Sequence, residues 1–183
     1  MPFIPNTQIA AAGAIALLEE QIAEGGGLAS FDFQNISGAY RHLMVKLIAR
    51  GDTGATFIQC DIRFNNDSGT NYHRESAAAL GSNMVVSQGQ AQTAGWGPEI
   101  PSGNSPASYF GIASIDIPYY SQANVFKGSY TSEIHARSAA VGNTLIASWN
   151  TLWLSTSEIS RVTIFPESGT LVQFSRASLY GLT

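Results

Sequence analysis

Charged side chains are scarce in this sequence. Lys, Arg, Asp and Glu make up 12% of its 183 residues, which is about half the share found in an average soluble protein. Only nine residues are basic and the net charge is -4, so we expect no nucleic-acid partner. Polarity must come instead from Ser, Thr, Asn, Gln and the 18 glycines. This composition fits a loop-rich β protein better than a charged helical enzyme.

Cysteine and long apolar runs are also scarce. Cys60 is the single cysteine, which excludes an internal disulfide. It alternates with Ile58 and Ile62, so we interpret it as a small buried apolar residue. No apolar run approaches the roughly 20 residues that span a bilayer, and no basic-then-apolar leader opens the chain. We therefore expect synthesis in a cytoplasm, no export by a signal peptide and no membrane partner.

The motifs of nucleotide and nucleophile chemistry are missing. The sequence has no Gly-x-Ser-x-Gly elbow, no phosphate-binding Gly-x-x-x-x-Gly-Lys, no Rossmann fingerprint and no Cys-x-x-Cys. The three histidines, His42, His73 and His135, are far apart, and each has an arginine within two residues. We interpret them as surface or half-buried side chains rather than zinc ligands. The sequence predicts no catalytic residue, no metal, no cofactor and no enzymatic activity.

Acidic residues offer two further sites, and both have a simpler explanation. A glycosidase would need a pair of carboxyl groups, but many acids, including Glu99 and Glu133, fall on expected outward positions or in turns. The Asn-Asn-Asp-Ser-Gly stretch at 65–69 lacks the alternating acids and the distal Glu of a calcium loop. We interpret it as a tight turn.

Alternation with a period of two is the main pattern of the chain and predicts strands. Runs of this kind cover 28–33, 42–48, 58–64, 108–117, 124–135 and 145–154, and 71–79 is a further candidate that follows the turn at 65–70. In the run at 145–154 Trp149 and Trp153 share a parity with Leu145, which favours the core, and in the run at 124–135 Phe126 and Tyr130 share one. About eight to ten strands with regularly spaced turns predict an all-β fold. We expect one antiparallel, jelly-roll-like β-sandwich over residues 16–183.

The C-terminal stretch holds two alternating runs separated by a Pro-Glu-Ser-Gly turn. Val162 and Ile164 share one face of the first run, and Leu171, Ala177 and Leu179 share one face of the second. Proline and glycine permit a reversal between them. We therefore predict an antiparallel pair that closes the fold and runs almost to the last residue.

The N-terminal residues 1–15 are expected to form an extended arm, because Pro2 and Pro5 fix the backbone and withhold donors. Phe3 and Ile4 have no evident local partner, so they pack either on their own domain or on a neighbouring subunit. Residues 9–24 favour a helix by propensity. We nevertheless predict a strand over 16–23, with a short helix over 7–14 as the alternative.

Residues 80–106 are rich in Gly, Ser, Gln and Pro and predict a long irregular loop. Trp96 stands there between Gly95 and Gly97. It is either a partner anchor or a cover for the edge of the core, and we favour the cover.

Several motifs resemble small all-β structural proteins of tailed bacteriophages, which serve as head decorations, fibre modules or tail accessory proteins. The motifs are ASFDF at 29–33, SGAYRHL at 37–43, IRFNNDSGTNY at 62–72, VTI at 162–164 and SRASLYGL at 175–182. Together they lie within residues 17–182. In the resembling proteins the segment that matches Leu17–Ala23 is the first strand and pairs with the segment that matches Leu28–Phe33.

The resemblance implies a structural virion protein, a capsid decoration or another accessory component, that acts by subunit–subunit contacts. Its partners would be its own copies, with a trimer as one option, and other virion proteins such as the major capsid protein. It would be located in the virion after synthesis in the host cytoplasm. Phe3, Ile4 and Trp96 are the candidate subunit contacts. The alternative is a receptor- or glycan-binding module of a phage fibre, in which aromatic rings stack on a host glycan.

Overall fold

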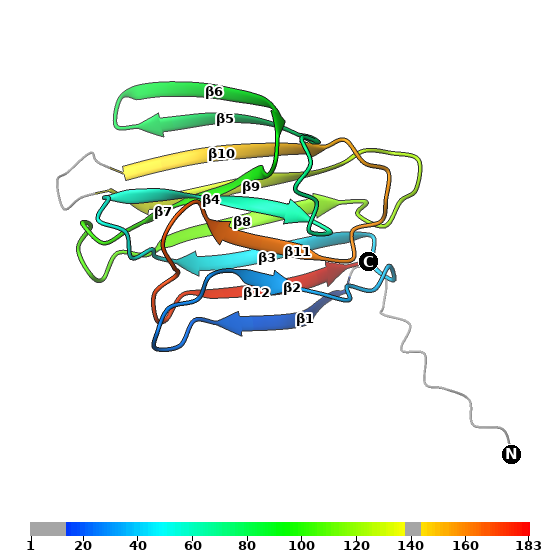
Figure 1. Ribbon diagram of the computed structural model, residues 1–183, viewed down its shortest axis with the longest axis horizontal. Helices are drawn as coiled ribbons and strands as arrows, with labels where there is room; N and C mark the ends of the chain where they lie inside the picture. Colours follow the sequence, from blue (N-terminus) through cyan, green and yellow to red (C-terminus); the bar gives the residue numbers. More distant parts are fainter. Residues whose placement is uncertain (1–13, 138–143) are drawn as a thin grey trace, which may run out of the picture.

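The computed structural model describes residues 14–137 and 144–183, which form twelve strands in two antiparallel sheets (Figure 1). The strands are β1 (Ile15–Ile22), β2 (Phe31–Phe33), β3 (His42–Ala49), β4 (Phe57–Phe64), β5 (Tyr72–Leu80), β6 (Asn83–Gln92), β7 (Gly95–Pro101), β8 (Gly111–Pro118), β9 (Lys127–Ala136), β10 (Thr144–Trp153), β11 (Val162–Pro166) and β12 (Arg176–Leu182). The predicted antiparallel β-sandwich is confirmed. The described residues include no helix that is long and apolar enough to cross a membrane.

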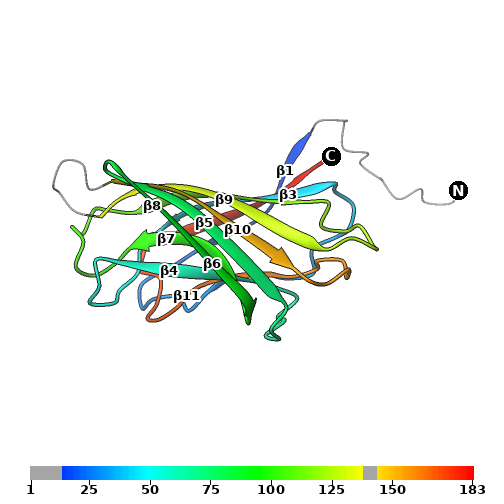
Figure 2. The ribbon, with the colours of Figure 1, turned by 90° about the horizontal axis from the view of Figure 1, so that it is seen from above.

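Eight of the strands have a jelly-roll arrangement. One sheet has the order β2-β11-β4-β7, and the other begins β1-β12-β3-β8. The chain crosses between the sheets at every step from β1 to β5, from β6 to β8 and from β10 to β12. Two such four-stranded layers, joined by crossing connections, make a jelly roll. Figure 2 shows the layers from the side, with β4 and β11 in one and β8 and β9 in the other.

Two further antiparallel pairs widen one of these sheets. The pair β5–β6 is inserted between β4 and β7, and the pair β9–β10 follows β8. They continue the larger sheet in the order β8-β9-β10-β5-β6, so that it has eight strands facing a layer of four. We call these four added strands the extension. Because the small sheet ends at β7, part of the extension has no layer opposite it.

The main core lies between the two sheets. Its largest fully buried members include Phe31, Phe64, Tyr72, Ile115 and Tyr120. The predicted core positions Trp149 and Trp153 and the predicted buried Cys60 are confirmed. Burial raises the pKa of the Cys60 thiol well above its ordinary value, so that thiol is a packing group rather than a nucleophile.

The predicted closing pair is wrong. β11 pairs with β2 and β4 in the small sheet, whereas β12 pairs with β1 and β3 in the large one. The predicted pairing of Leu17–Ala23 with Leu28–Phe33 is wrong for the same reason, because β1 and β2 belong to opposite sheets. Val162 and Ala177 do both face the core, but they reach it from opposite sides. Alternation specifies the face of a strand and leaves its partner open.

The predicted loop over residues 80–106 is also wrong, because β6 and β7 lie within it. β6 was missed since almost all of its residues are exposed on both faces, so the strand shows no apolar alternation. β7 was missed since it contains Pro98 and Pro101. It is an edge strand of the small sheet, where a missing N–H is tolerated.

The N-terminal predictions divide at the limit of the described residues. The strand expected over 16–23 is confirmed, since β1 covers Ile15–Ile22. The arm contacts Phe3 and Ile4 and the alternative helix over 7–14 lie in or extend into residues 1–13, outside the described part of the chain.

Candidate functional site

Trp96 lies on β7 where the small sheet meets the extension. Its ring contacts Trp149 of β10 edge to face, with the centroids 5.6 Å apart. The guanidinium of Arg74 on β5 lies 4.6 Å from the centre of the Trp96 ring. Trp96 is half-buried and packs on a second apolar cluster, which consists of Ala78, Leu145, Ala147 and Trp149. Its position at the edge of a core matches the favoured hypothesis, and a subunit contact through it stays a prediction.

A hollow of about 280 Å³ opens beside Trp96 under the uncovered part of the extension. Its apolar lining includes Leu80, Val85 and Leu145 together with the two tryptophans. Glu99 and Arg137 supply its charged groups. The hollow thus combines aromatic and aliphatic surface with one ion pair, which is the general character of a ligand site.

The floor beneath β7 is polar, because the inward positions of β9 carry polar side chains. These buried residues are Lys127, Ser129, Thr131, Glu133 and His135. The apolar residues of the same strand, Tyr130 and Ile134, are exposed, and so is Phe126 just before it. The shared parity of Phe126 and Tyr130 therefore marks the solvent face. Polar residues can be buried here because β7 supplies partners for some of them.

Glu133 and His135 form a buried charge cluster with Glu99 of β7 and with Arg137, which follows β9. Arg137 makes a two-pronged contact with Glu99, with its Nε 2.8 Å from Oε1 and its Nη2 2.7 Å from Oε2. His135 Nε2 lies 3.1 Å from Glu99 Oε1, and His135 Nδ1 lies 3.7 Å from Glu133 Oε1. The backbone N–H of Glu99 donates to Glu133 Oε2 at 2.6 Å. The cluster ties β7 to β9.

Burial raises the pKa of Glu133 to about 9, and the nearby carboxyl of Glu99 adds to the rise. Glu133 is therefore a neutral acid at pH 7. Only 1% of its side chain is exposed, so in this arrangement it holds the layers together and does not meet a ligand. The prediction that Glu99 and Glu133 point outward or lie in turns is wrong, as is the expectation that His135 is a surface or half-buried side chain.

The sequence does carry a trace of this cluster. Glu133, His135 and Arg137 follow one another at a spacing of two, which puts them on one face of a strand. That face was expected to be the solvent side because it is charged. Glu99 gave no signal, since it lies in the stretch that was expected to be a loop.

The other sequence candidates have structural partners. Burial raises the pKa of Asp61 to about 6, although Arg74 lies 3.4 Å from its carboxylate. Residues 65–69 form a turn in which Asp67 accepts hydrogen bonds from Trp153 Nε1 at 2.7 Å and from the backbone N–H of Gly69 at 2.8 Å. Within residues 14–137 and 144–183, no group of three His, Cys, Asp or Glu is placed to hold a metal ion.

The outer face of the large sheet carries a row of exposed isoleucines. Ile48 of β3 is opposite Ile112 of β8, Ile112 is opposite Ile134 of β9, and Ile134 is opposite Ile146 of β10. These four side chains, which we call the isoleucine row, are between 41% and 58% exposed. Directly opposite residues on one face have Cβ atoms about 5 Å apart, so the row is a continuous apolar band across four strands.

A second row runs beside the isoleucine row. In it Lys46, Ser114, Ser132 and Ser148 are opposite one another in the same strand order. The ammonium of Lys46 donates to the Ser114 hydroxyl at 2.9 Å. The band is therefore bordered by small hydroxyl groups with a single charge among them, a border that can approach another protein closely.

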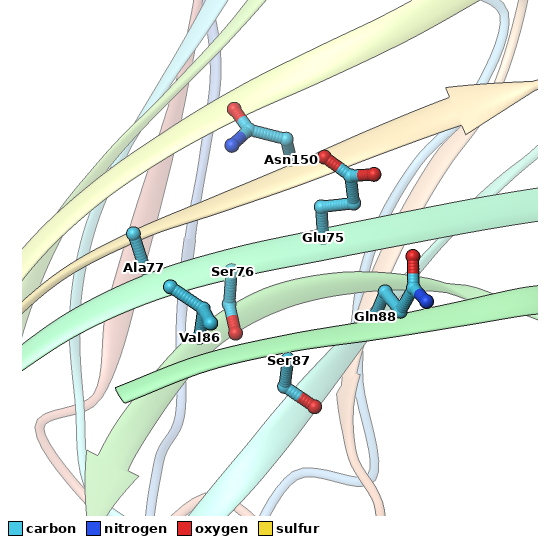
Figure 3. A pocket seen from close by; sticks show the side chains of 7 residues that line it. All are labelled: Glu75, Ser76, Ala77, Val86, Ser87, Gln88 and Asn150. Atoms are coloured by element: carbon cyan, nitrogen blue, oxygen red, sulfur yellow. The ribbon is translucent and has the colours of Figure 1, made fainter. Parts of the chain in front are cut away.

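The same face is hollowed at the far end of the extension. A cavity of about 570 Å³ lies along β10, β5 and β6 (Figure 3). Asn150 and Gln88 are both opposite Glu75, and Val86 is opposite Ala77. Apolar side chains thus lie beside two amides and the Glu75 carboxyl along the cavity.

No protein-family model matches the chain, and no curated protein matches it significantly.

Proposed function

We propose that this protein is a structural component of a tailed-bacteriophage particle, a capsid decoration or another accessory protein, and that it acts by contact between subunits. The isoleucine row is the single observation that carries the proposal. Four neighbouring strands each place an isoleucine on the solvent side at the same level. Contiguous exposed apolar surface of this kind marks interaction sites, because folding alone gains nothing from it.

The energetics support such a joint. Apolar surface removed from water stabilises an association by about 25 cal/mol per Å², before the cost of immobilising the partners. The second row beside the band, which consists of Lys46, Ser114, Ser132 and Ser148, adds hydrogen-bonding groups with little charge to desolvate. Lys46 is the one ionic group in it, and its partner Ser114 is neutral. A low charge density suits a large contact among many identical copies.

The jelly-roll core and the resemblance of five sequence segments to phage structural proteins point in the same direction. The partners we propose are other copies of this chain and a shell protein such as the major capsid protein. The proposed action is mechanical, since the contact between subunits itself stabilises the particle.

Electron microscopy with labelled antibody on purified particles tests the proposal directly. We expect wild-type protein on the particle surface and loss of the label for Ile134→Lys, which puts a charge in the band. Val125→Lys is the matched control, because Val125 is 48% exposed and Ile134 is 47% exposed, but Val125 lies outside the row. A particle that carries Ile134→Lys at the wild-type level would contradict the proposal.

The second candidate is a glycan-binding module of a fibre. It is favoured by the hollow beside Trp96, where two indole rings lie near the ion pair of Glu99 and Arg137. A glycan array tests it. Binding that is lost in Leu80→Trp, which fills the hollow, would support this function, and an array without any signal would count against it.

A further inference from the structure

The large sheet has two edges, β1 and β6, and only one is protected against pairing with another strand. β1 carries Glu19 and Glu20, and its register shifts between Leu17 and Glu19. Charges and bulges are the usual devices that stop an edge from adding a strand. β6 reads NMVVSQGQAQ, with no charged residue and no proline.

The geometry of the β5–β6 hairpin determines which backbone groups of β6 point away from the sheet. Gly81 and Ser82 form its two-residue loop, and Gly81 has a φ of 59°, as a type II′ turn requires. The flanking residues Leu80 and Asn83 are paired. Hydrogen-bonded and non-hydrogen-bonded pairs alternate from there, so Met84, Val86 and Gln88 direct their N–H and C=O groups outward.

The side chains of this part of β6 are apolar and open to solvent. Met84 is 70% exposed, Val85 is 56% exposed and Val86 is 77% exposed. Met84 is opposite Ala79, which is opposite Ile146 at the end of the isoleucine row. The apolar band therefore reaches the edge of the sheet and stops there. Further along, the β5–β6 register shifts between Tyr72 and Arg74, so the regular part of the edge is the first half of β6.

We infer that two copies of the chain pair through β6, antiparallel about a two-fold axis, and join their large sheets into one. The second copy is the partner that fits, because an uncharged edge meets its own image without repulsion and a two-fold contact is self-complementary. The register that matches the most apolar surface places Val85 opposite Val85 of the second copy. Met84 then lies opposite Val86 of the second copy. Val86 is opposite Ala77, which is opposite Ser148, so the isoleucine row of each copy meets the end of the neighbouring serine-containing row of the other.

The biological role of this dimer contact rests on the proposed function. The contact itself is tested on purified protein without any particle. Sedimentation equilibrium should give a dimer for the wild type. Val86→Pro should give a monomer with unchanged circular dichroism, because the proline removes an outward N–H and leaves the bonds to β5 in place. Leu17→Lys is the control on the protected edge and should remain a dimer, whereas Val86→Lys should not.

Cross-linking tests the register. Val85→Cys should oxidise to a covalent dimer, because a non-hydrogen-bonded pair has its Cα atoms about 4.5 Å apart, within the range of a disulfide. Val86→Cys should cross-link much more slowly, since Val86 faces Met84 of the second copy. The native Cys60 is buried and does not compete.

A wild type that stays monomeric at its solubility limit, a Val86→Pro variant that still dimerises, or faster cross-linking of Val86→Cys would overturn the inference. The two proposals fail separately. A dimer in solution that is absent from particles would remove the phage function and keep this joint, whereas a monomer found on particles would do the reverse.

Discussion

The backbone N–H of Glu99 donates a hydrogen bond of 2.6 Å to the side chain of Glu133, which joins two acidic residues across the layers of the sandwich. The two carboxyl groups can lie close together because burial raises the pKa of Glu133 to about 9, so the Glu133 carboxyl is neutral at pH 7 and does not repel Glu99. Arg137 meanwhile holds Glu99 by two hydrogen bonds. Glu133 is thus neutralised by a bound proton, and Glu99 by the guanidinium of Arg137.

The protonated Glu133 makes the stability depend on pH. Its pKa is about 9 in the fold against an ordinary 4.5, so between these values the folded state binds more protons than the unfolded one. The contribution of Glu133 to the free energy of unfolding is complete below pH 4.5. It is lost as the pH rises toward 9, by at most roughly 1.4 kcal/mol per pH unit. Urea unfolding between about pH 6.5 and pH 8.5, above the pKa of about 6 at Asp61, should show this fall.

Glu133→Gln isolates the effect, because the amide keeps an acceptor for the Glu99 N–H and cannot ionise. We expect a flat stability profile over the same range. A variant that loses stability with pH as steeply as the wild type would show that another group is responsible.

The pair Arg137 and Glu99 should be strongly coupled. Arg137→Met removes the guanidinium that holds the Glu99 carboxylate. The Glu99 side chain is only 7% exposed. We expect a loss of roughly 2 to 4 kcal/mol, because an uncompensated charge in a largely buried site is costly. The double variant Arg137→Met with Glu99→Gln should recover much of that loss. A thermodynamic cycle from urea unfolding measures the coupling, and additive losses would refute it.

Gly128 on β9 should resist substitution, because a Cβ there would lie 2.6 Å from the backbone oxygen of Thr151 on β10. Gly128→Ala must push the two strands apart, at a cost of roughly 1 to 3 kcal/mol. Gly54 is the control, since a Cβ there would meet nothing within 4 Å. Gly54→Ala should therefore change the melting temperature little. Equal effects of the two substitutions would contradict the packing of β9 on β10.

The sequence predicted the fold class and most core positions because both depend on alternation. Trp149 and Trp153 share a parity with Leu145, and all three are buried. Partners were not predictable, because alternation is local while pairing depends on the whole topology. Val162 and Ala177 show this, since each faces the core from a different sheet.

The candidate site was mostly hidden from the sequence, because two strands of the extension break the usual rule of burial. On β9, Tyr130 is exposed while Thr131 is buried, since that face meets β7 and the charge cluster. On β6, Val85 and Val86 are both exposed, so no apolar face exists to be recognised. Trp96 was expected in a loop and lies in a strand, and a subunit contact through it stays a prediction.

Trp96 itself should contribute to folding more than to association. Trp96→Ala removes the contact with the Trp149 ring and exposes the second apolar cluster. We expect a loss of about 2 kcal/mol, below the 3–5 kcal/mol of a fully buried tryptophan. Thermal melting and sedimentation of the same sample separate the two roles. A melting temperature that stays unchanged while the oligomer dissociates would make Trp96 a subunit anchor instead.

Ile112 and Ile115 on β8 test whether the isoleucine row belongs to an interface. Their side chains point to opposite faces of one strand: Ile115 is fully buried and Ile112 is 57% exposed. Ile115→Ala should cost roughly 3 kcal/mol of unfolding free energy through the cavity it leaves. Ile112→Ala should change that free energy by no more than about 0.5 kcal/mol, measured on the isolated protein by urea unfolding.

When assembly on the particle is measured, the order of the two effects should reverse, with Ile112→Ala the more harmful variant. Ile112→Ala removes apolar surface from the band and should weaken binding to the particle, whereas Ile115→Ala, studied well below its melting temperature, keeps the surface intact. If Ile112→Ala were as costly to the isolated protein as Ile115→Ala, the outer face would be a second core rather than a contact surface. The row could then no longer support a role in assembly.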